Sequence, residues 1–110
     1  MIKNQEFTYI GKNANIEGDF VFDGPTHIQG KIKGNIKAIG LSPLVIEINS
    51  VISGNLIGND IEIYGHFEGE IHAHGTVRIF PTGSFQGKIS TRMLEIYPGS
   101  IVNVDAHTTI

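Results

Sequence analysis

The sequence contains no cysteine among its 110 residues. It therefore has no disulfide framework, no thiolate metal ligand and no cysteine nucleophile, which fits a reducing compartment. Charged residues make up only 17% of the chain, compared with roughly 25% in typical soluble domains. The formal net charge is −3, and basic residues never cluster beyond two neighbours. A nucleic-acid partner is therefore not expected.

Long apolar segments are missing as well. The longest aliphatic run is Leu44-Val45-Ile46, whereas a membrane-spanning helix needs ~20 consecutive apolar residues. The opening segment MIKNQEFTYIGK lacks the continuous apolar stretch of a signal peptide. No window shows the i, i+3, i+4, i+7 spacing of an amphipathic helix. These absences predict a single cytoplasmic domain with almost no helix.

Glycine, by contrast, is abundant, with 14 residues against an average share of about 7%. Five glycines stand at the centre of one repeated pattern, with an apolar residue two positions before and two positions after each. The copies are IEGDF at 16–20, IKGNI at 32–36, ISGNL at 52–56, FEGEI at 67–71 and FQGKI at 85–89. A sixth, degenerate copy is IVNVD at 101–105. The chain is therefore built from internal repeats.

A second apolar pair, with its members two residues apart, precedes most copies. These pairs are Ile46/Ile48, Ile61/Ile63, Val77/Ile79 and Leu94/Ile96, with Thr26/Ile28 as a weaker first member. Strict alternation predicts half-buried strands. Pro43, Pro81 and Pro98 border these segments, where the missing N–H does little harm.

The central glycines of successive copies are 16, 20, 15 and 18 residues apart. Parallel strands usually need a long crossover, often a helix. Without helices, only a solenoid coil returns each strand to the same side, with one rung per repeat at ~4.8 Å. The predicted fold is all-β, a parallel β-helix of about six rungs without capping helices. The uneven coil lengths favour a right-handed coil over the strict hexapeptide period of left-handed β-helices.

This alignment places the coil at residues 9–105, between a short flexible N-terminal tail, 1–8, and a C-terminal tail, 106–110. It also predicts which side chains stack inward, with the central glycines at the corners of the coil. The inward stacks are Ile16, Ile32, Ile52, Phe67, Phe85 and Ile101; Phe20, Ile36, Leu56, Ile71 and Ile89; and Ile28, Ile48, Ile63, Ile79 and Ile96. Asp105 falls where the second stack calls for a further aliphatic residue. An outward column is expected at Glu47, Glu62, Arg78 and Glu95.

Candidates for catalysis are few. His66, His72 and His74 suggest a zinc site of two or three histidines, but the spacing supports no further ligand. We therefore assign no metal ligand, and interpret His27 and His107 as surface and tail residues. The serines lie near chain breaks, where turn chemistry explains them, and no helix follows the glycines to form a phosphate-binding loop. No catalytic or cofactor-binding residue is predicted, so the chain is not expected to be an enzyme. The alternative to a protein without catalytic activity is a trimeric β-helical enzyme of the acyltransferase or carbonic-anhydrase type.

The rungs IEGDF, IQGKIKGNI, FEGEI and FQGKI, with LEIYPGSI near the end, resemble the bactofilins. The resemblance extends from Tyr9 to Val104. It implies a right-handed parallel β-helix that polymerises end to end into cytoskeletal filaments without nucleotide. It further implies a bacterial scaffold for cell shape and for peptidoglycan-modifying or other envelope proteins. Members often bind the inner face of the cytoplasmic membrane through an N-terminal tail, which would here be Met1, Ile2 and Lys3.

The repeat pattern and its two ends also predict polymerisation, independently of this resemblance. A solenoid exposes an unpaired strand and an apolar cross-section at each end, and these are normally capped. The flanking segments MIKNQEFT and DAHTTI are too short for capping helices. We therefore expect the chain to bind copies of itself through both ends. The predicted contact residues are Leu94, Ile96, Ile101 and Val104 at the C-terminal end, and Phe7, Tyr9, Ile10 and Ile16 at the N-terminal end. The resemblance aligns Ile101 with the terminal contact of bactofilins.

Overall fold

The computed structural model describes residues 8–108, with side chains described as far as residue 103. These residues form strands joined by turns, and among them no helix is long and apolar enough to cross a membrane. The short strands are β1 (Thr8–Ile10), β3 (Thr26–Ile28), β5 (Leu44–Ile46), β7 (Ile61–Ile63), β9 (Thr76–Ile79) and β11 (Met93–Ile96). The long strands are β2 (Asn15–Asp23), β4 (Lys31–Ile39), β6 (Val51–Gly58), β8 (His66–Ala73), β10 (Ser84–Thr91) and β12 (Ile101–Thr108).

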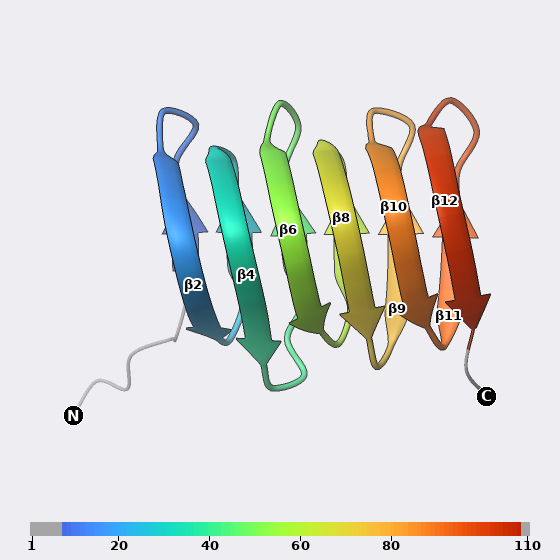
Figure 1. Cartoon of the computed structure of the whole chain (residues 1–110), viewed down its shortest axis with the longest axis horizontal. Coiled ribbons are helices and arrows are strands. Elements are labelled where there is room, and N and C mark those ends of the chain that lie inside the picture. The colour runs from blue at the N-terminus through green and yellow to red at the C-terminus, as the bar shows by residue number, and fades with distance from the viewer. Residues whose placement is uncertain (1–7, 109–110) are drawn as a thin grey trace.

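The strands form two six-stranded parallel sheets, one of short strands and one of long strands. Each short strand and the long strand after it make one rung. In Figure 1 the long strands lie in front and run downward, the short strands run upward behind them, and the chain advances from left to right. This geometry is a right-handed coil. The predicted right-handed β-helix of about six rungs is confirmed.

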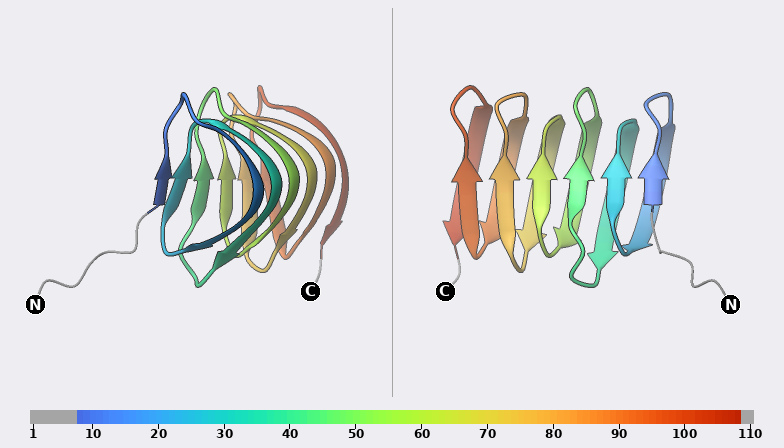
Figure 2. Two further views of the ribbon diagram at one scale, coloured as in Figure 1. Left: turned by 60° about the vertical axis from the view of Figure 1, so that its left-hand side comes forward. Right: turned by 180° about the vertical axis from the view of Figure 1, so that it is seen from behind.

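The central glycines lie at a bend within the long strands. Gly18, Gly34, Gly54, Gly69 and Gly87 pair with one another from rung to rung, with φ between 133° and 142°. Figure 2 shows the long strands curving around one side of the coil. L-residues other than glycine rarely adopt such φ values. From Gly34 onward, an added Cβ at these positions would also overlap the carbonyl oxygen of the glycine in the preceding rung. The bend therefore depends on glycine.

The core consists of apolar columns that run along the coil. Of the predicted inward stacks, every member in the second to fifth rungs except Ile48 is buried, including Ile36, Ile52, Leu56, Phe67, Ile71 and Phe85. The rings of Phe67 and Phe85 stack with their centroids 5.4 Å apart. The short strands contribute two columns. One consists of Ile28, Ile46, Ile63, Ile79 and Ile96, and the other of Thr26, Leu44, Ile61, Val77 and Leu94. Stacking identical positions every ~4.8 Å lets each rung bury the apolar face of its neighbour.

The predicted inward position of Ile48 is wrong. Strand β5 ends at Ile46, which pairs with Ile28 and Ile63 and is fully buried, whereas Ile48 is 50% exposed. The chain turns directly after β5, because the Ser50 amide donates to the Glu47 carbonyl and Asn49 has a φ of 69°. Glu47 therefore leaves the predicted outward column, and Val45 takes its place beside Glu62.

The predicted alignment of the sixth copy is also wrong, by one residue. Ile101 pairs with Ser84, and Val102 rather than Ile101 continues the column of Phe85. The Ile101 side chain is accordingly 74% exposed, while Val102 packs against the core. In the same register Ala106, not Asp105, pairs with Ile89. The hydrogen bond from the Ile101 amide to the Gly83 carbonyl fixes where β12 begins and hence which side chains alternate inward.

Candidate polymerisation interface

Both ends of the coil carry edge strands. β1 and β2 at one end and β11 and β12 at the other each pair with a strand on one side only. The long edges span nine residues in β2 and eight in β12, and half of their N–H and C=O groups point away from the neighbouring strand. In residues 8–108 no helix or loop crosses either end (Figure 1). Natural proteins usually cover or blunt such edges, because they can pair with another chain.

The C-terminal end exposes the apolar cross-section of the core. Along one column, Ile28, Ile46, Ile63 and Ile79 are 0% exposed, but the next member, Ile96, is 48% exposed. Ile96 lies in the last strand of this sheet, and no further rung covers it within the described residues. Leu94 and Val102 end two other columns and are half-buried, although they pack against the core. Contact with another molecule at this end would bury more of this apolar surface.

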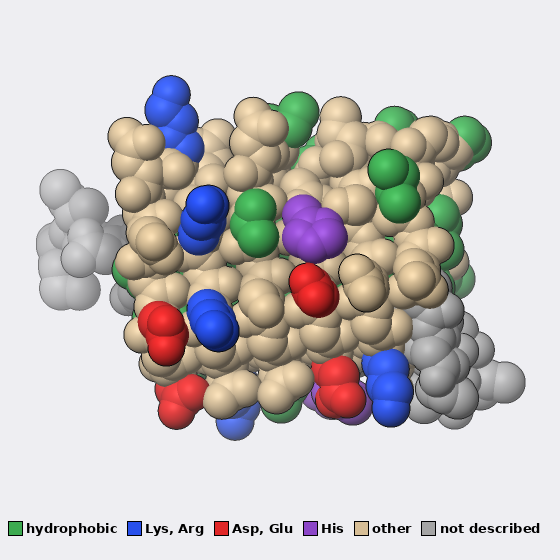
Figure 3. Space-filling model, turned by 45° about the horizontal axis from the view of Figure 1, so that its top comes forward, with side chains coloured by type: hydrophobic (Ala, Val, Ile, Leu, Met, Phe, Trp, Pro, Cys, Tyr) green, Lys and Arg blue, Asp and Glu red, His purple; other side chains and the backbone are tan. Residues whose placement is uncertain are grey.

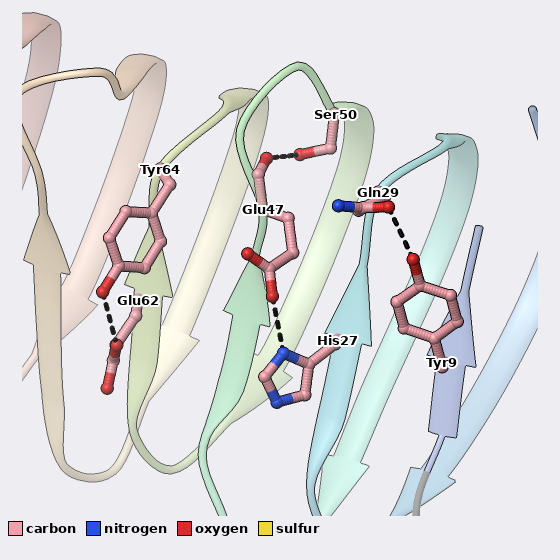
Figure 4. A network of polar contacts seen from close by, with 7 residues as sticks. All are labelled: Tyr9, His27, Gln29, Glu47, Ser50, Glu62 and Tyr64. Atoms are coloured by element: carbon pink, nitrogen blue, oxygen red, sulfur yellow. Dashed lines mark hydrogen bonds and ion pairs between the residues drawn. The ribbon is translucent and has the colours of Figure 1, made fainter. Parts of the chain in front are cut away.

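An aromatic ladder, formed by Tyr64, Phe80 and Tyr97, ends at the same rung. The ring centroids of Tyr64 and Phe80 are 4.2 Å apart, and those of Phe80 and Tyr97 are 4.9 Å apart. Burial, and next the charge of Glu62, raise the pKa of the Tyr64 hydroxyl, which donates a hydrogen bond to that carboxylate (Figure 4). Tyr97 is partly exposed and ends the stack. The ladder was not predicted, although its sequence signal is an Ile-aromatic pair that occurs three times, at 63–64, 79–80 and 96–97.

The N-terminal end presents a similar layer. Ile10 and Ile16 are half-buried and pack against the core, in agreement with their predicted place in the first rung. Phe20 and Phe22, which were not predicted as end residues, also lie in this rung, with ring centroids 6.0 Å apart. Tyr9 is exposed, and its hydroxyl donates to the Gln29 side chain of the next rung at 2.6 Å (Figure 4).

Several predicted contact residues cannot be placed. Phe7, Met1, Ile2 and Lys3 lie outside the described residues, and Val104 lies in β12 beyond the described side chains. Ile101 lies in the last rung as predicted, but on the outer face of its strand. The part of these residues in a contact with another subunit or a membrane stays a prediction.

Of the histidines considered as metal ligands, His66 and His72 lie in β8, and His74 directly follows that strand. His66 Nδ1 lies 2.6 Å from the Ser84 hydroxyl, and His72 lies 3.7 Å from the Glu70 carboxylate. His27 Nδ1 approaches the Glu47 carboxylate at 2.6 Å and links two rungs (Figure 4). Within the described part of the chain, no group of three or more His, Asp or Glu side chains could hold a metal ion.

The chain is similar to known proteins along almost its whole length. The family model for Bactofilin, described as polymer-forming cytoskeletal, matches residues 8–107. Among solved structures, the Thermus thermophilus bactofilin from a cryo-EM reconstruction of double helical filaments has 22% sequence identity and a TM-score of 0.77. That match covers 91% of this chain and 99% of the Thermus chain. No curated protein matches. The extent of the family match shows that the chain belongs to the bactofilins, a family of polymer-forming cytoskeletal proteins.

Proposed function

We propose that the chain is a structural subunit that assembles end to end into filaments without nucleotide. The observation that carries this proposal is the difference between Ile96 and the interior members of its column, which are fully buried. A second subunit stacked on the last rung would bury the same position and pair the edge of β12. The family description as polymer-forming supports self-association. No observation favours the enzyme alternative.

The energetic gain of such a contact comes from several modest terms. Full burial of an aliphatic side chain stabilises by about 1.5–3 kcal/mol, so the half-exposed Ile96 can contribute about half of that amount. Leu94, Val102 and the aromatic ladder add further apolar surface. Edge hydrogen bonds add specificity, because they require strands to meet in register. None of these terms uses a bound phosphate, so assembly is expected without ATP or GTP.

The test is a pair of matched substitutions, Ile96→Arg and Ile48→Arg. The two isoleucines are equally exposed, at 48% and 50%, but Ile96 lies in the last rung and Ile48 in a turn of the third. Ile96→Arg places a charge where stacking would remove water, and this carries a penalty of several kcal/mol unless the charge is paired. We expect filaments of wild type and Ile48→Arg, and soluble subunits of Ile96→Arg, in sedimentation and electron microscopy.

Circular dichroism must show that both variants keep the β-sheet signal of the wild type. Folded Ile96→Arg that still forms filaments of normal length would refute the end contact. Filaments of the wild type that form only after nucleotide is added would refute nucleotide independence.

We further propose a scaffolding role in the cell, supporting cell shape or the position of envelope enzymes, with membrane contact through Met1, Ile2 and Lys3. A single short tail binds weakly, but a filament presents many copies, and multivalency multiplies weak sites. We expect deletion of residues 1–6 to reduce co-sedimentation of filaments with liposomes. Filaments of the shortened chain that bind liposomes as well as wild-type filaments would contradict the membrane contact.

The filaments of the Thermus bactofilin are described as double helical. A double filament needs a contact between its two strands in addition to the end contact. By analogy, we propose that filaments of this chain also associate side by side.

A further inference from the structure

A group of aliphatic side chains is exposed on the flank of the coil, away from both ends. Leu41 is 83% exposed and Val21 is 67% exposed, and Ile39 and Ile57 are also exposed. Together with Lys37 they form the aliphatic patch. The patch lies at the C-terminal ends of β2, β4 and β6 and on the loop that follows β4. This loop projects beyond the other connections at the lower edge of Figure 1.

The members of the patch are contiguous. Val21, Lys37 and Ile57 are paired in register on neighbouring strands, at ~4.8 Å spacing. They line a shallow groove of about 320 Å³, and a second groove of about 360 Å³ extends from Lys37 and Ile57 to Ile39 and Leu41. Scattered exposed aliphatic residues are ordinary, but a contiguous patch bordered by charges marks an interaction site.

The β-helical fold does not by itself require this patch. In later rungs the position of Ile57 is taken by His72 and then Ser90, which are polar. Figure 3 shows the face that includes the N-terminal halves of the long strands, where charged side chains and a histidine are spread among a few hydrophobic ones. Other exposed aliphatic side chains lie at the opposite edge, at Ile48 and Val51, and in the last rung. The patch is the group at the C-terminal ends of the long strands, and there it is limited to the first three rungs.

The charges at the patch favour a second copy of this chain as its occupant. The Lys37 ammonium has no ion-pair partner among the described residues, and Asp19 lines the same groove from the neighbouring strand. The Asp19 carboxylate is engaged by the Asn35 amide at 2.8 Å, an exposed neutral partner. A two-fold contact presents the same surface from both sides, so Lys37 in the patch and Asp19 beside it can form two ion pairs across the contact.

We propose that two copies associate side by side through the aliphatic patch, related by a two-fold axis that runs along the strands between β2 and β4. This arrangement places β4 of each copy over β2 of the other. Lys37 then lies over Val21 of the second copy and reaches its Asp19, while the aliphatic side chains exclude water around both ion pairs. The contact between two copies does not itself require a filament. The proposal rests on the proposed filament only for the number of contacts, because each filament repeats the patch many times. An anionic lipid surface fits less well, since Asp19 and Asp23 lie beside the patch.

The experiment is a charge reversal at the two predicted partners, measured by electron microscopy of full-length filaments. Lys37→Glu and Asp19→Lys should each lower the share of paired filaments about tenfold or more, because one repulsive contact is repeated along the filament. The double variant should restore pairing. Lys88→Glu is the matched control, since Lys88 is an exposed lysine on the same sheet in the fifth rung. It should leave pairing unchanged.

The outcomes separate this proposal from the proposed function. Wild-type filaments that are always single, or paired filaments that survive both single reversals, would overturn the patch contact and leave end-to-end assembly intact. Absence of any filament would refute end-to-end assembly.

The patch contact can still be tested in that case by analytical ultracentrifugation. We then expect a wild-type dimer that is lost in Lys37→Glu and regained in the double variant. A monomeric wild type would refute the patch contact. If Lys37→Glu abolishes binding to vesicles of acidic phospholipid but not pairing, the patch is a lipid contact and the proposal is wrong.

Discussion

At the scale of single residues, the glycine column shows how one residue type determines the coil. The five central glycines share φ values near 140° and lie directly above one another. A side chain at any of them meets a backbone conformation that L-residues rarely adopt, and from Gly34 onward it also meets the backbone of the rung before. The sequence revealed this position because one glycine interrupts the strand-like alternation in each of five repeats, and glycine is unfavourable in a strand interior.

We predict that Gly54→Ala destabilises the chain by more than about 2 kcal/mol, because strained backbone alone costs about 1–3 kcal/mol. The overlap of the new methyl group with the Gly34 carbonyl adds to that cost. The measurement is the free energy of unfolding in denaturant, made on protein kept unassembled by the Ile96→Arg substitution.

Gly58→Ala is the matched control for this prediction. A Cβ at Gly58 would meet its nearest atom, the Cβ of Ala38, at 3.5 Å, which is ordinary contact. Gly58 also pairs with Ala73, so an alanine extends an existing column. Replacing glycine at a compatible site stabilises by about 0.4–1 kcal/mol. Equal effects of the two substitutions would show that the bend tolerates a side chain.

At the scale of strands, the sequence predicts the long strands better than the short ones. Each long strand has a central glycine and two flanking apolar residues, and a shift by one residue would place all of these on the wrong face. A short strand has only two inward positions, so Ile46 and Ile48 mimic the pattern although the chain already turns at Glu47. The sixth copy failed for a related reason. Without a glycine, IVNVD could be aligned on Ile101 or on Val102, and only the turn before β12 decides between them.

The two candidate interfaces, the end rungs and the aliphatic patch, also differ in how well the sequence predicts them. The end rungs could be predicted, since the order of repeats identifies the first and the last. Their aromatic content was harder to predict, because Phe80 and Tyr97 stack only if the connections place their rungs in register. The aliphatic patch was missed because it depends on exposure. Val21 and Ile57 look like core residues in sequence, and only their outward direction after the glycine bend distinguishes them.

At the scale of the whole molecule, a solenoid is nearly one-dimensional, and each rung contacts only its neighbours. The stability of the chain and the geometry of its ends are therefore separable. Residues 61–76 make up one complete rung. The rung begins at Ile61 in β7 and ends directly before Val77 in β9, and Ile61 and Val77 are partners in register. Removing them would stack Val77 on Leu44 and Phe85 on Ile52, and each of these pairs combines residues from the same column.

We predict that the chain without residues 61–76 still folds and still forms filaments, because both end rungs are retained. It should be less stable than the wild type, since one layer of core is lost. In an end-to-end filament the subunit length sets the longitudinal repeat, so cryo-electron microscopy should show that repeat shortened by ~4.8 Å, the height of one rung. The same deletion carrying Ile96→Arg should be folded and unassembled, which ties assembly to the end rung. A filament of the shortened chain with an unchanged longitudinal repeat would mean that subunits do not stack through their ends, whatever other contacts hold the polymer together.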